Sequence, residues 1–183
     1  FARHGPRGMH LEKIVRGSFM VRILRVFLLV MLGLSVTACS KFKTYNGPEV
    51  TRVIVDKGDR KMYLLHHAEV LKQYNVGLGF APDGHKGQQG DGRTPEGNYT
   101  IDRRNPNSAF YLSIGIDYPN AEDKRRAREA GVSPGGDIFI HGRPWKNRKG
   151  GRDWTAGCIA VTNSEMRDIY AMVRNGTPIT ITP

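Results

Sequence analysis

Residues 153–161 read Asp-Trp-Thr-Ala-Gly-Cys-Ile-Ala-Val, a stretch that brings a cysteine, Cys158, to the start of an apolar run. Seventeen positions earlier, His141 and Gly142 close another apolar run. A thiolate is a far better nucleophile than a thiol, so an imidazole near the sulfur can activate it. Gly157 has no Cβ, and we expect the N–H groups of Gly157 and Cys158 to face a developing oxyanion. From the spacing alone, an inert cysteine buried in a strand is an equally good interpretation.

A second cysteine, Cys39, ends a segment with the features of an export signal. Two arginines precede an apolar core at 26–34, which is too short for a comfortable membrane span. The end of this segment, Val-Thr-Ala-Cys at 36–39, resembles a bacterial lipobox, in which the cysteine carries lipid and becomes the first mature residue. We therefore expect residues 20–39 to be a lipoprotein signal peptide and Cys39 to be its lipidation site.

The expected organisation of the chain follows from this signal. Residues 1–19 are interpreted as upstream translation or vector-encoded sequence, 40–49 as a tether and 50–183 as one catalytic domain. Ser40 follows the lipidated position, and the absence of a retention aspartate there indicates a periplasmic protein anchored to the outer membrane. With Cys39 lipidated, Cys158 has no disulfide partner within the mature chain. We expect no metal site and no organic cofactor.

The basic charge of the chain narrows the class of partner. The net charge is +11, and residues 1–39 hold six Arg or Lys and one acidic residue, which leaves 22 cations against 16 acids. A basic exported protein can bind nucleic acid, anionic lipid or an acidic polymer. Export argues against nucleic acid, whereas peptidoglycan stem peptides carry several carboxylates that suit a basic pocket. A charge-driven binder of anionic polymers, with no role for the thiol, is the alternative.

Short strands dominate the predicted secondary structure, so the predicted fold class is mainly β with two helices. Capping residues predict one helix from Asn120 to Gly131 and another from Thr162 to about Arg174. Pro178 indicates that the last strand lies at a sheet edge, where a missing N–H is tolerated. The glycine-rich loop 77–97 is long enough to be functional or disordered. Strands are predicted at 51–56, 61–66, 70–77, 110–116, 137–141, 157–162 and 178–181, with a hairpin tip at 57–61 and a further strand entered through the turn 94–101.

Three motifs in a fixed order carry a family resemblance. Residues 92–97 read Gly-Arg-Thr-Pro-Glu-Gly, 140–142 read Ile-His-Gly and 155–158 read Thr-Ala-Gly-Cys. Together they resemble the L,D-transpeptidase catalytic domain (YkuD type), and specifically its YafK-like branch. The resemblance runs from about Val50 to Pro183 and implies a β-sandwich-like domain of mixed sheets plus two helices.

The resemblance also implies a mechanism. Cys158 is expected to attack the carbonyl of the diamino acid of a stem peptide, with His141 as general base and then general acid. A backbone carbonyl or Asp153 is expected to orient the imidazole. An amine acceptor then resolves the thioester, which cross-links the wall or attaches a lipoprotein. Two alternatives stay open: a hydrolase that cleaves lipoprotein or stem peptides from peptidoglycan, and a catalytically lapsed wall-binding lipoprotein.

Two positions depart from the family pattern, and a basic segment lies between the motifs. Many members have His where this chain has Ala156 and Arg where it has Ala160, and the missing Arg leaves transferase and hydrolase both open. Segment 143–152 is basic, and the two tryptophans of the chain, Trp145 and Trp154, lie with it between His141 and Cys158. We expect a mobile lid whose cations bind stem-peptide carboxylates, with a solvated surface loop as the alternative. The residues expected to bind substrate are Gly142, Arg143, Arg152, Trp154 and Thr155.

Overall fold

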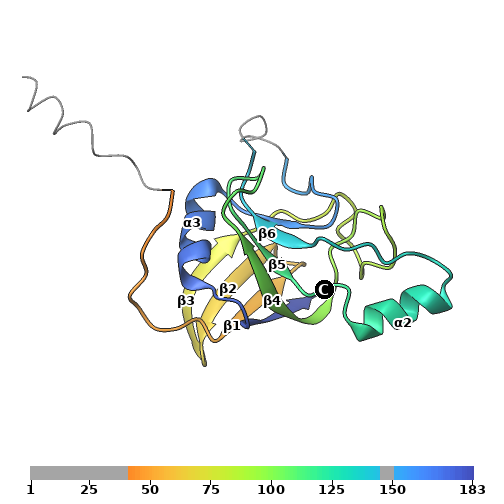
Figure 1. Ribbon diagram of the computed structural model, residues 1–183, viewed down its shortest axis with the longest axis horizontal. Helices are drawn as coiled ribbons and strands as arrows, with labels where there is room; N and C mark the ends of the chain where they lie inside the picture. The colour runs from red at the N-terminus through yellow and green to blue at the C-terminus, as the bar shows by residue number, and fades with distance from the viewer. Residues whose placement is uncertain (1–40, 145–150) are drawn as a thin grey trace, which may run out of the picture. The chain divides into compact units, whose positions relative to one another are not determined.

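Eight strands form one continuous mixed sheet in the computed structural model (Figure 1), in the order β3-β2-β1-β8-β4-β5-β6-β7. The structure describes residues 41–144 and 151–183. The predicted signal peptide with Cys39 and part of the predicted lid, including Trp145, lie outside these residues. The predicted fold class, mainly β with two helices, is confirmed. The strands are β1 Arg52–Asp56, β2 Lys61–His66, β3 Glu69–Asn75, β4 Gly97–Asn105, β5 Ser113–Ile116, β6 Phe139–His141, β7 Ile159–Ala160 and β8 Pro178–Thr182.

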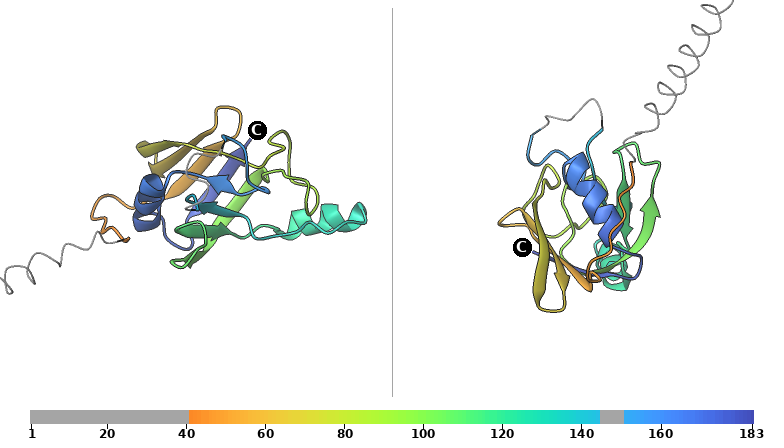
Figure 2. Two further views of the ribbon diagram at one scale, coloured as in Figure 1. Left: turned by 90° about the horizontal axis from the view of Figure 1, so that it is seen from above. Right: turned by 90° about the vertical axis from the view of Figure 1, so that its left-hand side faces the viewer.

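The long strand β4 joins two halves of the sheet. Its first residues pair with β8 and its last residues pair with β5, and the register shifts between Ile101 and Arg103. The two halves face each other (Figure 2) and enclose the apolar core. This arrangement agrees with the predicted sandwich-like fold. Side chains with no exposed area in this core include Val53, Leu64, Ile101, Ile114, Ile140, Ile159, Ile169 and Ile179.

Strands β1 and β2 bury alternate residues, as expected for strands with one face against the core. Val53 and Val55 of β1 are fully buried, while the residues between and beside them are partly or fully exposed. Asp56 pairs with Lys61, so the predicted hairpin tip at 57–61 is confirmed. A strand with one face against a core requires this period of two, which explains why the prediction succeeds here.

The predicted position of the last strand is wrong. Strand β8 lies in the middle of the sheet, parallel to β1 on one side and antiparallel to β4 on the other. Pro178 is its first residue and pairs with Thr100 at the end of the ladder. A proline at the first position of a strand interrupts no interior ladder bond, so it is compatible with a central strand.

Both predicted helices are present, and both begin at the predicted cap. Helix α2, Ala121–Glu129, begins after Asn120, whose side chain accepts from the amides of Glu122 and Asp123. Helix α3, Asn163–Met172, begins after Thr162 and carries the predicted capping box with Glu165. It ends before the predicted Arg174 because Val173 leaves the helical conformation (φ −91°, ψ 131°). Within residues 41–144 and 151–183, no helix has the length and apolarity needed to cross a membrane.

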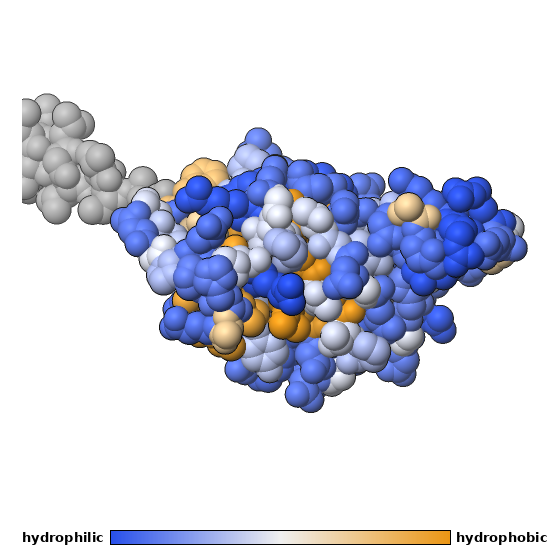
Figure 3. Space-filling view, turned by 90° about the horizontal axis from the view of Figure 1, so that it is seen from below, coloured by the Kyte–Doolittle hydropathy of each residue, from blue (hydrophilic) through white to orange (hydrophobic). Residues whose placement is uncertain are grey.

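The surface is mainly hydrophilic on the face shown in Figure 3, and its most apolar side chains gather in a central band. Few large apolar side chains are exposed in the described part of the chain. Two of them, Phe80 and Phe110, belong to segments that contact the motif residues described next.

Candidate active site

Two adjacent strands bring His141 and Cys158 to one end of the sheet. Strands β6 and β7 are parallel, and His141 pairs with Ala160. Cys158 precedes Ala160 by two residues, and residues two apart along a strand share a face. Because Cys158 immediately precedes β7, the register brings the cysteine and the histidine to the same end of the β6–β7 pair. Cys158 is a free, partly buried thiol.

The imidazole of His141 is held by aromatic rings and by one backbone carbonyl. Only 3% of His141 is exposed, and its ring centroid lies 4.5 Å from that of Phe110 and 5.8 Å from that of Trp154. Nδ1 lies 2.6 Å from the carbonyl oxygen of Gly142. Because a carbonyl only accepts, Nδ1 carries the proton and Nε2 is the basic nitrogen. Burial lowers the pKa of His141, the Gly142 hydrogen bond opposes this, and the charge of Arg143 lowers it further.

The orienting group, which the sequence leaves open, is thus the Gly142 carbonyl. Asp153 has other partners. Its carboxylate forms an ion pair with Arg60 at 3.0 Å and accepts the backbone N–H of Leu78 at 2.9 Å. Asp153 therefore fixes the segment that follows β3 against the cysteine motif.

The sulfur of Cys158 contacts the backbone of the residues that lead into β6. The thiol donates to the carbonyl of Asp137 at 3.4 Å, and the backbone N–H of Phe139 bonds to the sulfur. Burial raises the pKa of the Cys158 thiol, and the Phe139 N–H opposes this shift. A raised thiol pKa beside a lowered imidazole pKa means that both groups are neutral at rest, so attack requires general-base catalysis.

The turn before the nucleophile is fixed by Thr155. Its hydroxyl donates to the carbonyl of Cys158 at 2.7 Å and accepts the N–H of Gly157 at 3.2 Å. Gly157 has φ +131°, and a Cβ there would lie 2.6 Å from the carbonyl oxygen of Arg93. In this state the N–H of Gly157, which the sequence predicts to be an oxyanion donor, is directed to Thr155. The N–H of Cys158 is the other member of the predicted donor pair.

The glycine-rich segment is ordered and packs along the cysteine motif. Gly77 and Gly79 form isolated bridges with Ala160 and Thr155. Farther along, the Asp91 carboxylate accepts from the Lys86 ammonium and from three backbone amides. Burial opposes its ionisation, but these donors together lower the pKa of Asp91 to about 2. Of the two predicted states of this loop, functional or disordered, the structure excludes disorder.

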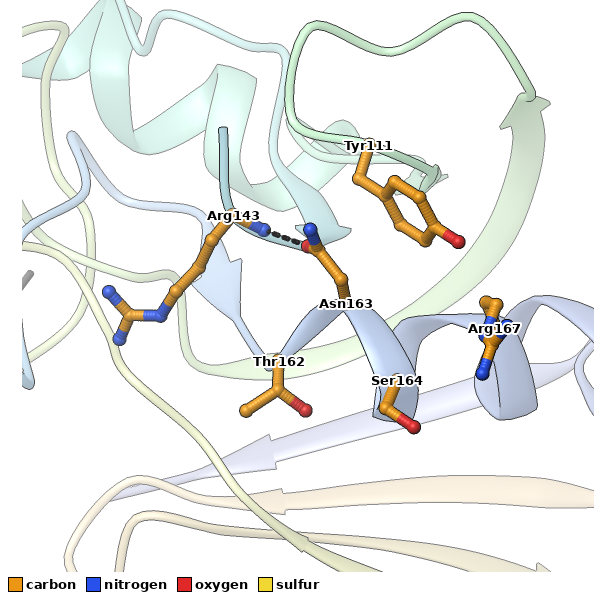
Figure 4. Close-up of a pocket in the computed structure, with 6 residues that line it drawn as sticks. All are labelled: Tyr111, Arg143, Thr162, Asn163, Ser164 and Arg167. Atoms are coloured by element: carbon orange, nitrogen blue, oxygen red, sulfur yellow. Dashed lines mark hydrogen bonds between the residues drawn. The ribbon is translucent and has the colours of Figure 1, made fainter. Parts of the chain in front are cut away.

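Arg143 lines two pockets, one of which is shown in Figure 4. Its N–H donates to the side chain of Asn163 at 2.6 Å, and its guanidinium carbon lies 5.4 Å from the ring centroid of Trp154. One pocket has a volume of about 400 Å³ and the other about 310 Å³. Arg152, the second predicted cation, lines the smaller one. The larger is lined by Tyr111, Arg143, Thr162, Asn163, Ser164 and Arg167.

Sequence reasoning missed the contribution of the α3 N-terminus to this region. Asn163 was recognised only as part of a capping box, although its side chain also clamps the backbone beside the base. Arg167 lies one turn further along the same helix and carried no motif. Trp145, Lys146, Arg148 and Lys149 of the predicted lid lie outside the described residues. Within those that the structure describes, no three His, Cys, Asp or Glu side chains come together as a metal-ion site.

The chain is similar in sequence to known proteins. Residues 50–181 match the model of a family described as YkuD, the L,D-transpeptidase catalytic domain. The protein "Putative L,D-transpeptidase YafK" of Escherichia coli (strain K12) is 32% identical over 116 residues, which make up 62% of this chain and 39% of that protein.

Solved structures share the fold. The helical cell shape determining protein Pgp2 of Campylobacter jejuni (K307A mutant) has a TM-score of 0.59 and 26% identity, over 75% of this chain and 48% of that chain. Bd1075 of Bdellovibrio bacteriovorus has a TM-score of 0.54 and 24% identity, over 77% of this chain and 50% of that chain. The chain spans less than half the length of YafK and Pgp2. Because the family match covers almost all of the described residues, the chain belongs to the YkuD L,D-transpeptidase catalytic domain family.

Proposed function

We propose that this chain is an exported cysteine enzyme that modifies peptidoglycan by acyl transfer. The observation that carries the proposal is that His141 ends β6 and Cys158 immediately precedes β7, which pairs with β6, while Nδ1 of the imidazole is anchored so that Nε2 can act as a base. Family membership sets the reaction class that this pair would serve. The proposed substrate is a peptidoglycan stem peptide, cleaved after its diamino acid.

The proposed reaction proceeds through a thioester. Nε2 of His141 removes the thiol proton while the sulfur of Cys158 attacks the carbonyl carbon of the diamino acid. The tetrahedral oxyanion is stabilised by backbone N–H groups of the Gly157–Cys158 turn. The intermediate collapses, the bond to the terminal D-amino acid breaks, and the imidazolium gives its proton to the leaving amine. An acceptor amine then attacks the thioester and releases the free thiol.

Formation of the oxyanion site requires a small rearrangement. Because the Gly157 N–H donates to Thr155 in the resting state, only the Cys158 N–H serves at once. A substrate carbonyl can compete for the Gly157 N–H if the Thr155 hydroxyl keeps its bond to the Cys158 carbonyl. Removing one oxyanion donor typically raises the activation barrier by about 3 kcal/mol. Transfer of the Gly157 N–H from Thr155 to the oxyanion would therefore stabilise the transition state.

Arg143, Arg152 and Trp154 are proposed to bind the carboxylates of the stem peptide. Arg143 lines both pockets, and Arg152 adds a second cation to the smaller one. The indole N–H of Trp154 is buried and has no hydrogen-bond acceptor among the described residues. An unpaired buried donor costs about 1–3 kcal/mol, which a substrate acceptor would recover. Gly142 and Thr155 complete this proposed subsite as backbone and turn residues.

A hydrolase of the same family is the second candidate. Ala160 is 1% exposed and forms backbone hydrogen bonds with Gly77, so no cation stands two residues after the nucleophile. A site that holds its acceptor less firmly favours water as the group that resolves the thioester. Release of a wall-linked lipoprotein would be the corresponding activity.

Incubation of the full-length protein with tetrapeptide muropeptides tests the proposal. We expect mass spectrometry to show an acyl-enzyme on the Cys158 peptide, and then cross-linked products if an amine resolves it. Products that are only shortened by one residue, or a wall-linked lipoprotein that is released, would identify the hydrolase. Cys158→Ala should give none of these species. Activity retained by Cys158→Ala would refute the mechanism. An inactive wild type would refute the enzyme proposal and leave the catalytically lapsed, wall-binding lipoprotein as the remaining interpretation.

The proposed location is the periplasm, with a lipid on Cys39 anchoring the protein to the outer membrane. Metabolic labelling of the wild type and Cys39→Ala with a fatty-acid analogue, followed by membrane fractionation, tests this. We expect label and outer-membrane association only in the wild type. Label that persists in Cys39→Ala would refute the assignment.

A further inference from the structure

We propose that Arg103 of β4 is a positioning residue for the Cys158 thiol and acts through Asp137 and Phe139. The inference rests on the proposed function only in taking Cys158 as the reacting group. None of the three motifs of the sequence includes Arg103.

A row of residues across three strands carries Arg103 towards the cysteine. Arg103 of β4 pairs with Gly115 of β5, and Gly115 pairs with Phe139 of β6. A Cβ at Gly115 would lie 2.6 Å from Cγ of Arg103, so the arginine lies over the space that the glycine leaves. Its guanidinium carbon reaches 4.6 Å from the ring centroid of Phe139, within cation–π distance.

The side chain of Arg103 contacts the two residues whose backbones contact the sulfur. Its guanidinium lies 3.4 Å from the carboxylate of Asp137 and stacks on Phe139. The carbonyl of Asp137 accepts the Cys158 thiol, and the N–H of Phe139 bonds to the sulfur. Asp137 has φ +57°, a conformation uncommon outside glycine, and this conformation aims its carbonyl. Arg103 thus holds both backbone contacts of the nucleophile in place.

The same placement gives Arg103 an electrostatic effect on the thiolate. Burial raises the pKa of Cys158 most strongly, and the Phe139 N–H lowers it. Smaller effects come from charged side chains: the Asp137 carboxylate raises this pKa, and Lys86 and Arg103 lower it. Arg103 also holds Asp102 at 2.8 Å, so part of its charge is already compensated. The charged groups that act on the thiol are Asp137, Lys86 and Arg103.

Alkylation of Cys158 across a pH series tests this inference in the full-length protein. Iodoacetamide reacts with the thiolate, and peptide-resolved mass spectrometry separates the Cys158 peptide from the Cys39 peptide. For Arg103→Gln we expect the midpoint of the pH profile to rise by about half a unit to one unit, so the rate at pH 8 falls about 3- to 10-fold. Arg103→Lys should restore most of the rate because it keeps the charge. Arg52→Gln, an exposed arginine of β1, is the control and should leave the profile unchanged.

A merely structural role would give a different result. Arg103→Gln would then lower the melting temperature and leave the midpoint of the folded protein unchanged, and that outcome would overturn the inference. If Arg103→Gln does not fold, the pH profile of the Asp137→Asn variant tests the inference instead. Loss of this carboxylate should lower the midpoint, and an unchanged midpoint would again overturn the proposal. Alkylation requires no stem peptide, so a shifted profile in a protein without muropeptide activity would refute the proposed function and leave the role of Arg103 standing.

Discussion

The two halves of the sheet differ in how their residues are held. Strands β1, β2, β3 and β8 are five to seven residues long, and all but β3 bury alternate side chains. Strands β5, β6 and β7 have only four, three and two residues. The short strands are supported from outside the ladder, by bridges from Gly77 and Gly79 and by the Thr155 turn.

This difference separates stability from chemistry. Both halves contribute apolar side chains to the core, whose burial is the main source of folding free energy, but the regular half holds them along longer ladders and lacks the motif residues. The short half exposes turns and carbonyl groups close to the nucleophile and the base, and it fixes them with individual hydrogen bonds. Changes in one half should therefore alter stability, and changes in the other should alter reactivity.

His141→Asn should give the largest effect, confined to chemistry. Loss of the general base is expected to reduce kcat/KM for a muropeptide substrate about 10²- to 10⁴-fold. The melting temperature should fall much less than the activity, because Asn can still donate to the Gly142 carbonyl although it fills less of the buried site. His66→Asn, in the regular half, is the matched control and should keep full activity. Equal losses in both variants would show that the two halves are not separable.

Leu64→Ala should give the opposite result. Leu64 has no exposed area and lies in β2, so truncation should cost about 2–5 kcal/mol of unfolding free energy in urea. The folded fraction should retain normal activity per molecule. Val70→Ala in β3 is the control, since 51% of Val70 is exposed and the change should stay within about 0.5 kcal/mol.

Gly157→Ala tests whether the turn before Cys158 depends on its backbone conformation. The positive φ and the Arg93 carbonyl leave no room for a Cβ, so we expect a loss of about 1–3 kcal/mol together with slower acyl-enzyme formation. Gly87→Ala is the matched control, because nothing lies within 4 Å of a Cβ there. A Gly157→Ala protein with normal rate and stability would contradict the geometry of the turn.

The pH dependence should give the smallest and most specific effect. Because the pKa of His141 is lowered in the folded protein, its neutral form contributes stability that is complete above the unfolded value of about 6.5. This contribution is lost as the pH falls from there through the folded pKa. Melting temperatures from pH 8 to pH 5 should decline more steeply for the wild type than for His141→Asn, and activity should persist below pH 6.5. Parallel declines would contradict the lowered pKa.

Local signals explain what the sequence could predict. The capping residues Asn120 and Thr162 and the alternation of β1 and β2 each depend on neighbours within a few positions, so element type and start were predictable. The motif residues Cys158 and His141 were selected by spacing and resemblance. Their approach to one another depends on the β6–β7 register, which requires the structure.

Pairing between distant segments explains what the sequence could not predict. Nothing near Pro178 indicates that β8 lies between β1 and β4, since its neighbours lie far away in the chain. The hydrogen bond of the Gly157 N–H to Thr155 depends on one rotamer. The row of Arg103, Gly115 and Phe139 depends on two strand registers, one of which contains a shift.

The central position of β8 has a consequence for how the chain acquires its structure. The hydroxyl of Thr182 bonds to the carbonyl of Val55 across 127 positions, and β8 is the strand that connects β1 to β4 in the sheet, so this connection needs a segment that is synthesised late. Until then β1 and β4 each present an unpaired edge, and pairing of this sequence separation is slow. The nascent chain therefore passes through a stage with two open sheets. Assembly of the Cys158–His141 pair into a closed domain waits for its last strand.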